Sequence, residues 1–265
     1  MRSRVAEAFD SLAQTYDQKL EPDRWMRNEL WGRYLTLFCV GDHVLDVGCG
    51  TGEDSLFLAR NGIRVTALDI SEAMIQRLRS KMRQAGLDNL IETRVQDCAV
   101  LHAMPVAHFD GIISAFAALN TIPDLPMFAA QAGRLLRPQG RAIFHLLNRF
   151  SLWEWLGLLG RGQISSARQV GKSLERTFSI GGYPIRHRLW TPYEAYHTAF
   201  SKCFHLRRVY GLGALRPPQL PYQLPGTMVA ALGSLEGKVR GHRPFLNWGR
   251  FFVLELEKRQ QPAHP

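Results

Sequence analysis

The chain has 265 residues, of which 46% are apolar and 10% aromatic, and its formal net charge is +10. This composition excludes wholesale disorder, and the length suits one large α/β domain with a lid as well as two small domains. Four scattered cysteines without a C-x-x-C pair argue against a zinc site and against a disulfide framework. We therefore expect a cytoplasmic protein without a metal site.

Neither a secretory signal nor a membrane-spanning helix is expected. No apolar run of signal-peptide length follows the first arginines, so we expect the mature protein to start here. The most apolar stretch, residues 151–160, contains Glu154 and is shorter than the ~18 residues that a membrane-spanning helix needs.

The predicted elements before residue 149 alternate between strands and helices. Two amphipathic helices, 6–16 and 23–38, are followed by a short buried strand, 44–47, that ends at a glycine-rich loop. The later expectations are helix 53–60, strand 64–68, a helix from Ser71 to Gly86, strands 90–95 and 109–114, helix 125–136 and strand 141–146. This alternation predicts an α/β fold with a parallel sheet and right-handed crossovers.

The C-terminal part differs from this scaffold in charge and composition. Residues 1–148 hold 16 Lys and Arg against 17 Asp and Glu, whereas residues 149–265 hold 17 against 6. Strands 205–210 and 251–256 are expected to close the sheet as an antiparallel pair. The segment between them carries Pro217, Pro218, Pro221 and Pro225 and allows no assignment.

The loop after the first strand reads Asp46-Val-Gly48-Cys-Gly50-Thr-Gly52-Glu53, and Asp69 stands at the end of the second strand. In an open α/β sheet this carboxylate reaches the crevice at the carboxyl ends of the strands, where it can accept ribose hydroxyls. The loop therefore predicts an adenosine-containing ligand.

Charge and spacing favour S-adenosylmethionine (SAM) as that ligand. A dinucleotide fingerprint needs a glycine at position 53, which is Glu, and no Gly-Lys-Ser/Thr of a phosphate-binding loop follows. Carboxylates around the loop would oppose a pyrophosphate but suit a sulfonium and an ammonium. Glu53 and Asp54 equally suit the positive end of a helix dipole, so their role stays open.

These residues resemble the class I SAM-dependent methyltransferases, in the branch of the ubiquinone and menaquinone methyltransferases. The resemblance continues through Val95-Gln-Asp-Cys98, strand 109–114 and Leu135-Leu-Arg-Pro-Gln-Gly140, and residues 8–17 resemble the helix that precedes the core in that branch. It implies a Rossmann-like sheet of seven mostly parallel strands with helices on both faces. The domains would be an N-terminal helical cap (1–40), a SAM-binding core (41–148) and a cover with the closing strands (149–265).

The resemblance also implies a set of cofactor contacts. Asp46 would support the methionine ammonium, Asp69 the ribose and Ile70 the adenine face, while Tyr16 would close over the cofactor unless it is only packed in the core. The full set of expected cofactor-binding residues is Tyr16, Asp46, Gly48, Cys49, Gly50, Asp69, Ile70, Asp97, Cys98, Ser114 and Ala115. Cys49 and Cys98 are expected to be small buried side chains beside the pocket and not nucleophiles.

Methyl transfer to a hydroxyl or an acidic carbon needs a group that takes the proton. His145 is the first candidate, because the end of the last parallel strand faces the crevice; a capping role for it stays open. His187, His197 and His205 are further candidates. The Asn/Asp-Pro-Pro-aromatic motif of amino-directed DNA methyltransferases is absent, because Ala115-Phe-Ala-Ala stands after strand 109–114.

Residues 149–200 lie where the family inserts its substrate cover. Trp153, Trp155 and nearby leucines beside arginines could cover a lipophilic acceptor, rest on a membrane surface or simply pack as a lid helix. We expect a methyltransferase acting on a small, lipophilic or aromatic molecule. An RNA methyltransferase, favoured by the basic C-terminal part, and a non-catalytic SAM-binding protein remain alternatives, and no oligomeric state is implied.

Overall fold

A seven-stranded sheet forms the centre of the molecule in the computed structural model, which describes residues 3–217 and 225–260. Six strands run in the same direction, and β9 lies antiparallel between β5 and β8. The order across the sheet is β3 (Ile91–Val95), β2 (Arg64–Asp69), β1 (His43–Val47), β4 (Phe109–Ser114), β5 (Leu136–Leu147), β9 (Phe251–Lys258) and β8 (Phe204–Leu212). The expected Rossmann-like fold and its closing strand pair are confirmed.

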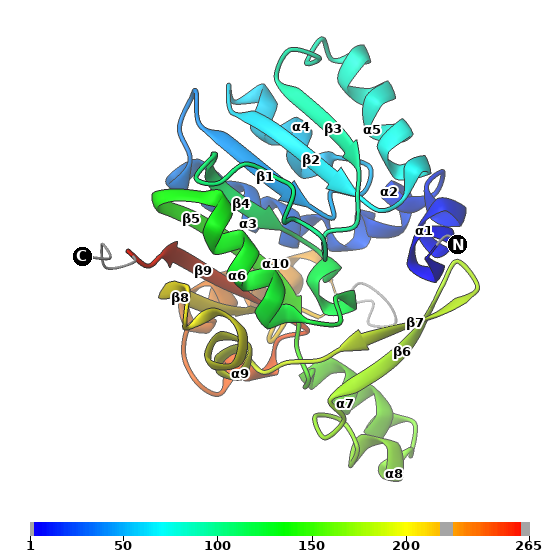
Figure 1. The fold of residues 1–265 in the computed structure, drawn as a ribbon. Helices are drawn as coiled ribbons and strands as arrows, with labels where there is room; N and C mark the ends of the chain where they lie inside the picture. The colour runs from blue at the N-terminus through cyan, green and yellow to red at the C-terminus, as the bar shows by residue number, and fades with distance from the viewer. Residues whose placement is uncertain (1–2, 218–224, 261–265) are drawn as a thin grey trace.

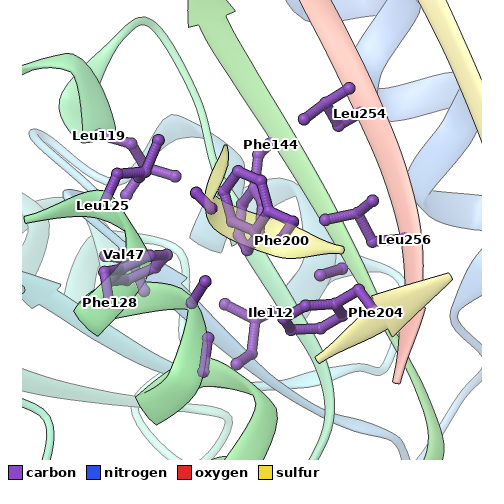
Figure 2. Close-up of a cluster of buried hydrophobic side chains, with 14 of the residues drawn as sticks. Val47, Ile112, Leu119, Leu125, Phe128, Phe144, Phe200, Phe204, Leu254 and Leu256 are labelled. Atoms are coloured by element: carbon purple, nitrogen blue, oxygen red, sulfur yellow. The ribbon is translucent and has the colours of Figure 1, made fainter. Parts of the chain in front are cut away.

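Helices cover both faces of the sheet, as Figure 1 shows. One face carries α3 (Arg24–Leu37), α4 (Glu53–Arg60) and α5 (Glu72–Gln84); the other carries α6 (Leu125–Leu135) and the π-helix η3 (Tyr196–Phe200). Strand β5 shows why both faces are covered, since Phe144 packs in one apolar cluster and its neighbour Ile143 packs in the other. Figure 2 shows Phe144 among the aromatic and aliphatic side chains of the first cluster.

The N-terminal part is divided more finely than the sequence predicts. It forms α1 (Arg4–Leu12), α2 (Tyr16–Leu20) and a turn of 3₁₀-helix, η1 (Glu21–Asp23), before α3. Asp10 of α1 accepts a hydrogen bond from Ser71 Oγ at 2.6 Å, which fastens α1 to the start of α5. The N-terminal helices therefore lie at the carboxyl ends of the parallel strands, where the site was expected.

A second region lies between β5 and β8. It contains α7 (Leu152–Gly160), α8 (Ile164–Ala167), α9 (Pro192–Ala195) and a hairpin of β6 (Glu175–Ile180) and β7 (Tyr183–Arg188). In Figure 1 the hairpin reaches toward α1, while α7 and α8 project away from the sheet. We call residues 149–200 the cover.

The segment that allowed no assignment contains α10 (Gly226–Val239) and α11 (Phe245–Trp248). Glu236 of α10 is buried, and its carboxylate accepts hydrogen bonds from the backbone of Gly213 at 2.8 Å and Leu215 at 2.7 Å. These bonds attach α10 to the chain that leaves β8. Pro218 and Pro221 lie outside the described residues.

Candidate active site

The glycine loop after β1 adopts a backbone that other residues would strain. Gly48 has a φ of 71°, and a Cβ built on it would lie 2.4 Å from the Cβ of Ala118. Gly50 has a φ of 55°, and its Cβ would lie 3.3 Å from Cε1 of Tyr16. Left-handed backbone and close neighbours together explain why glycine occupies these positions.

Asp69 ends β2 directly beside this loop. Its carboxylate accepts hydrogen bonds from the backbone N–H of Gly50 and of Ser71, both at 2.8 Å. Burial raises the pKa of Asp69 to about 6, and the two backbone donors oppose that rise. A carboxylate has about four acceptor sites, so two remain for further donors such as ribose hydroxyls.

The carboxylate of Asp46 lies beneath the loop. It is buried and accepts a hydrogen bond from Ser55 Oγ at 2.6 Å. Burial, reinforced by the negative charge of Asp54, raises the pKa of Asp46. Asp46 does not line the cavity described below, so its support of the methionine ammonium stays a prediction.

The two acidic residues that begin α4 have structural partners. Glu53 pairs with Lys81 at 2.7 Å, and Asp54 forms a buried ion pair with Arg27. Asp54 also accepts a hydrogen bond from Trp31 Nε1 at 2.8 Å. Both carboxylates therefore anchor neighbouring helices to the loop.

Tyr16 is held over the glycine loop by its neighbour. The carboxylate of Asp17 accepts a hydrogen bond from the Thr51 hydroxyl and pairs with Lys81 at 2.7 Å. Tyr16 lines the cavity, and burial raises its pKa to about 12. The N-terminal helices thus form one wall of the site.

A cavity of about 680 Å³ opens at the carboxyl ends of the strands. Its volume falls in the range of about 300–1,000 Å³ that is typical of ligand pockets. Seven of the predicted cofactor residues line it, namely Tyr16, Gly48, Gly50, Asp69, Ile70, Cys98 and Ala115. The structure thus brings together the glycine loop, the carboxylate of Asp69 that is expected to hold the ribose, and the expected adenine side of the site.

Four of the predicted cofactor residues, Asp46, Cys49, Asp97 and Ser114, do not line the cavity, and neither does His145. Ser114 Oγ donates to the carbonyl of Val47 at 2.8 Å, and Asp97 is exposed and accepts from the backbone of Ala99 at 2.8 Å. Cys49 is buried, and burial raises the pKa of its thiol. These side chains support the loops around the site, and their direct contacts with a cofactor stay predictions.

His145 lies inside β5 and not at its end, because the strand continues to Leu147. Its ring packs against Phe251, with the ring centroids 4.4 Å apart, and its Nδ1 accepts a hydrogen bond from the N–H of Phe116 at 3.2 Å. Phe116 and Phe251 line the cavity, whereas His145 does not. The expectation that His145 faces the crevice is therefore not met: its imidazole supports the cavity wall.

The hydrogen bond that Phe116 N–H donates to His145 supports an unusual turn. Phe116 and Ala117 follow β4 with φ values of 50° and 66°, which residues with side chains rarely adopt. The guanidinium of Arg27 lies 4.5 Å from the centroid of the Phe116 ring. His145 therefore holds the backbone of the turn at Phe116, and Arg27 holds the aromatic ring of Phe116.

The cover supplies the wall opposite the glycine loop. Its hairpin turns at Gly181 and Gly182, both with positive φ, and Ile180 pairs with Tyr183 across the two-residue loop. Phe178 and Ile180 of β6 line the cavity, as do Phe9 and Leu12 of α1. Sequence reasoning missed this hairpin, although a Gly-Gly pair between alternating runs is its usual signal.

His187 of β7 is the predicted histidine that lines the cavity. It is buried, its Nδ1 lies 3.1 Å from the carbonyl of Ile185, and burial lowers its pKa. A carbonyl accepts, so Nδ1 carries the proton and Nε2 keeps its lone pair. His197 and His205 are exposed and do not line the cavity.

The sheet and the cavity define a Rossmann-like fold with a cavity at the carboxyl ends of the strands, which the cover also lines. The methyltransferase domain family matches residues 44–140. Demethylmenaquinone methyltransferase of Symbiobacterium thermophilum is 34% identical over 149 residues, covering 52% of this chain and 57% of that relative. 27-O-demethylrifamycin SV methyltransferase of Amycolatopsis mediterranei is 36% identical over 149 residues, covering 56% of this chain and 53% of that relative. The chain therefore spans little more than half the length of these relatives.

Solved structures support the fold. A SAM-dependent methyltransferase of Methanosarcina mazei matches with a TM-score of 0.58 at 20% identity, covering 85% of this chain and 96% of that one. Geranyl diphosphate C-methyltransferase of Streptomyces coelicolor, solved with Mg²⁺, geranyl diphosphate and S-adenosyl-L-homocysteine, matches with a TM-score of 0.56 at 14% identity, covering 89% and 79%. Residues 44–140 are thus similar to the methyltransferase domain family, and the chain as a whole shares the fold of these solved methyltransferases.

Proposed function

We propose that this protein transfers the methyl group of SAM to a small apolar molecule held between the glycine loop and the cover. The observation that carries the proposal is the shared cavity, which the loop residues Gly48 and Asp69 line together with Phe178 and Ile180 of the cover. The relatives named above methylate a quinone precursor and a rifamycin by their names, which supports a small-molecule acceptor.

The residues present fit SAM. Asp69 offers free acceptor sites, and the backbone at Gly48 and Gly50 leaves no side chain between the loop and the cavity. SAM supplies an activated methyl group: the new bond to the acceptor forms as the methyl–sulfur bond breaks, and that electron pair stays on sulfur. The apolar walls of the cover exclude water and hold the acceptor near the loop.

A hydroxyl or carbon acceptor must also lose a proton. We propose His187 Nε2 as the group that takes it, because the Ile185 carbonyl fixes the proton on Nδ1 and burial keeps the imidazole neutral. This assignment replaces His145, whose ring lies behind Phe116. We expect His187→Gln to lower turnover by about 10²- to 10⁴-fold with unchanged SAM affinity; wild-type turnover would exclude the role.

Calorimetric titration with SAM, S-adenosylhomocysteine and NADH tests the cofactor first. Micromolar binding of the first two without binding of NADH supports the proposal, whereas binding of NADH alone contradicts it.

Transfer of labelled methyl from SAM to pools of quinones and phenols, lipids and RNA then identifies the acceptor class. The relatives do not favour RNA; a labelled RNA pool would establish that alternative, and SAM binding without transfer to any pool would indicate a non-catalytic protein.

A further inference from the structure

Helix α7 and the chain that follows it leave an unusual amount of apolar surface exposed. Leu156 and Leu159 of α7 are 38% and 37% exposed, and Ile164 and Leu174 are 55% and 49% exposed. None of the nine residues of α7 is buried, although six of them are leucine or tryptophan. Apolar side chains grouped on one projection in this way mark a binding surface.

The same projection is positively charged. Residues 155–174 contain three Lys or Arg and no Asp or Glu. The acidic residues at its two ends are neutralised within the cover, since Glu154 pairs with Arg176 at 2.7 Å and Glu175 lies 3.5 Å from Arg186. Arg168 and Lys172 are exposed, and among the described residues neither has an acidic partner. The surface is therefore both apolar and cationic.

This surface adjoins the cavity. Trp153, Glu154 and Gly157 of α7 line the cavity, while Leu156 and Leu159 of the same helix are exposed to solvent. In Figure 1, α7 and α8 form a projection at one end of the molecule, away from the sheet. A surface that binds this projection would therefore lie close to the cavity wall that α7 forms.

We propose that Leu156, Leu159, Ile164 and Leu174, together with Arg168 and Lys172, dock on an anionic lipid bilayer. Leucines next to arginine and lysine are the composition of segments that lie in the membrane interface, with apolar side chains inserted and cations at the headgroups. RNA phosphates would bind the cations but would leave the four apolar side chains in water. Docking on the bilayer does not depend on the proposed function. That the bilayer supplies the acceptor does rest on the proposed function.

Vesicle flotation tests the proposal with the full chain. Vesicles of phosphatidylcholine alone and of phosphatidylcholine with phosphatidylglycerol are compared at low and high salt. We expect binding to the anionic vesicles that weakens as salt rises, because headgroup attraction is screened. Arg168→Gln with Lys172→Gln should lower partitioning about thirtyfold, and Leu156→Ser with Leu159→Ser at least about tenfold.

Matched variants far from the projection serve as controls. Arg60→Gln with Arg83→Gln removes two exposed cations from the last turns of α4 and α5, and Val40→Ser with Val106→Ser removes two exposed apolar side chains. We expect both control pairs to bind vesicles like the wild type. Circular dichroism and SAM titration show that each variant is folded and holds its cofactor.

Three outcomes overturn the docking: no vesicle binding, binding that the projection variants leave unchanged, or retention of tRNA that they abolish without vesicle binding. The proposed function fails separately, because a protein that binds vesicles but not SAM would dock without being a methyltransferase. Conversely, SAM binding and methyl transfer without vesicle binding would leave the proposed function intact and exclude the docking.

Discussion

Helices α6 and α7 are both rich in apolar residues, yet they have opposite surroundings. Six of the eleven residues of α6 are buried against the sheet, whereas none of the nine residues of α7 is buried. Residues of α6 pack against β4 and β5, the strands that precede and follow α6 in the chain. Helix α7 instead projects from the cover. An apolar sequence thus predicts burial only where the fold offers a surface to cover, and the exposure of α7 is what the proposed docking accounts for.

Truncation of one apolar side chain in each helix should separate the two roles most clearly. Phe128→Ala in α6 removes a ring packed 5.7 Å from that of Phe144, and we expect it to lower the free energy of unfolding by about 3–5 kcal/mol. Leu156→Ala in α7 should change it by less than about 0.5 kcal/mol. Urea unfolding of both variants measures the difference; equal losses would mean that α7 is part of the core.

A second prediction concerns the scaffold side of the cavity. Asp69→Ala removes a carboxylate that we expect to accept ribose hydroxyls, and hydrogen bonds to a charged group contribute about 1.5–3 kcal/mol each. Loss of two such bonds should weaken SAM binding by about 100-fold or more, measured by calorimetry.

Asp69→Asn is the matched control, because it keeps one acceptor of the same size and should lose less affinity. Both variants also disturb the bond to Gly50, so circular dichroism must show an intact fold. Unchanged SAM affinity in Asp69→Ala would exclude the ribose assignment, and no cover variant outside the cavity is expected to reproduce its effect.

The scaffold could be predicted from the sequence in detail, but the cover could not. The scaffold carries local signals, namely short apolar strands, the cap at Ser71 and the spacing of the glycines. At each of these signals the structure has the expected element. The hairpin carried a local signal too, in Gly181 and Gly182, but its position against α1 depends on contacts between residues about 170 apart, such as Ser11 with Gly181. Such contacts leave no periodic pattern in a single sequence.

The directions of the side chains near the site could not be predicted from the sequence either. His145 was expected at a strand end, but β5 extends two residues beyond it and turns its ring toward Phe116 and Phe251. Asp46 shows the same limit, because it stands in the motif while its carboxylate bonds to Ser55 beneath the loop. Motif positions thus locate a site, whereas the alternation of side chains along a strand decides which of them reach the cavity.

The smallest expected effect concerns the wall between the two regions, where His145 supports Phe116. Burial lowers the pKa of His145 to about 3, and the positive charges of Arg27 and Arg250 add to this. The unfolded chain binds a proton there at its ordinary pKa of about 6.5, while the native state does not. The contribution of the neutral His145 ring to the free energy of unfolding therefore has its full value above pH 6.5. It falls by about 1.4 kcal/mol per pH unit as the pH drops from 6.5 to 3.

His145→Asn removes this titration while offering an oxygen to the N–H of Phe116. Urea unfolding of both proteins between pH 7.5 and 4.5 should show the wild type losing stability faster than the variant as pH falls. Asp46, Asp69 and His187 are present in both proteins, so their titration cancels in the difference. Parallel pH profiles would mean that His145 accepts a proton in the folded state, which its position behind Phe116 argues against.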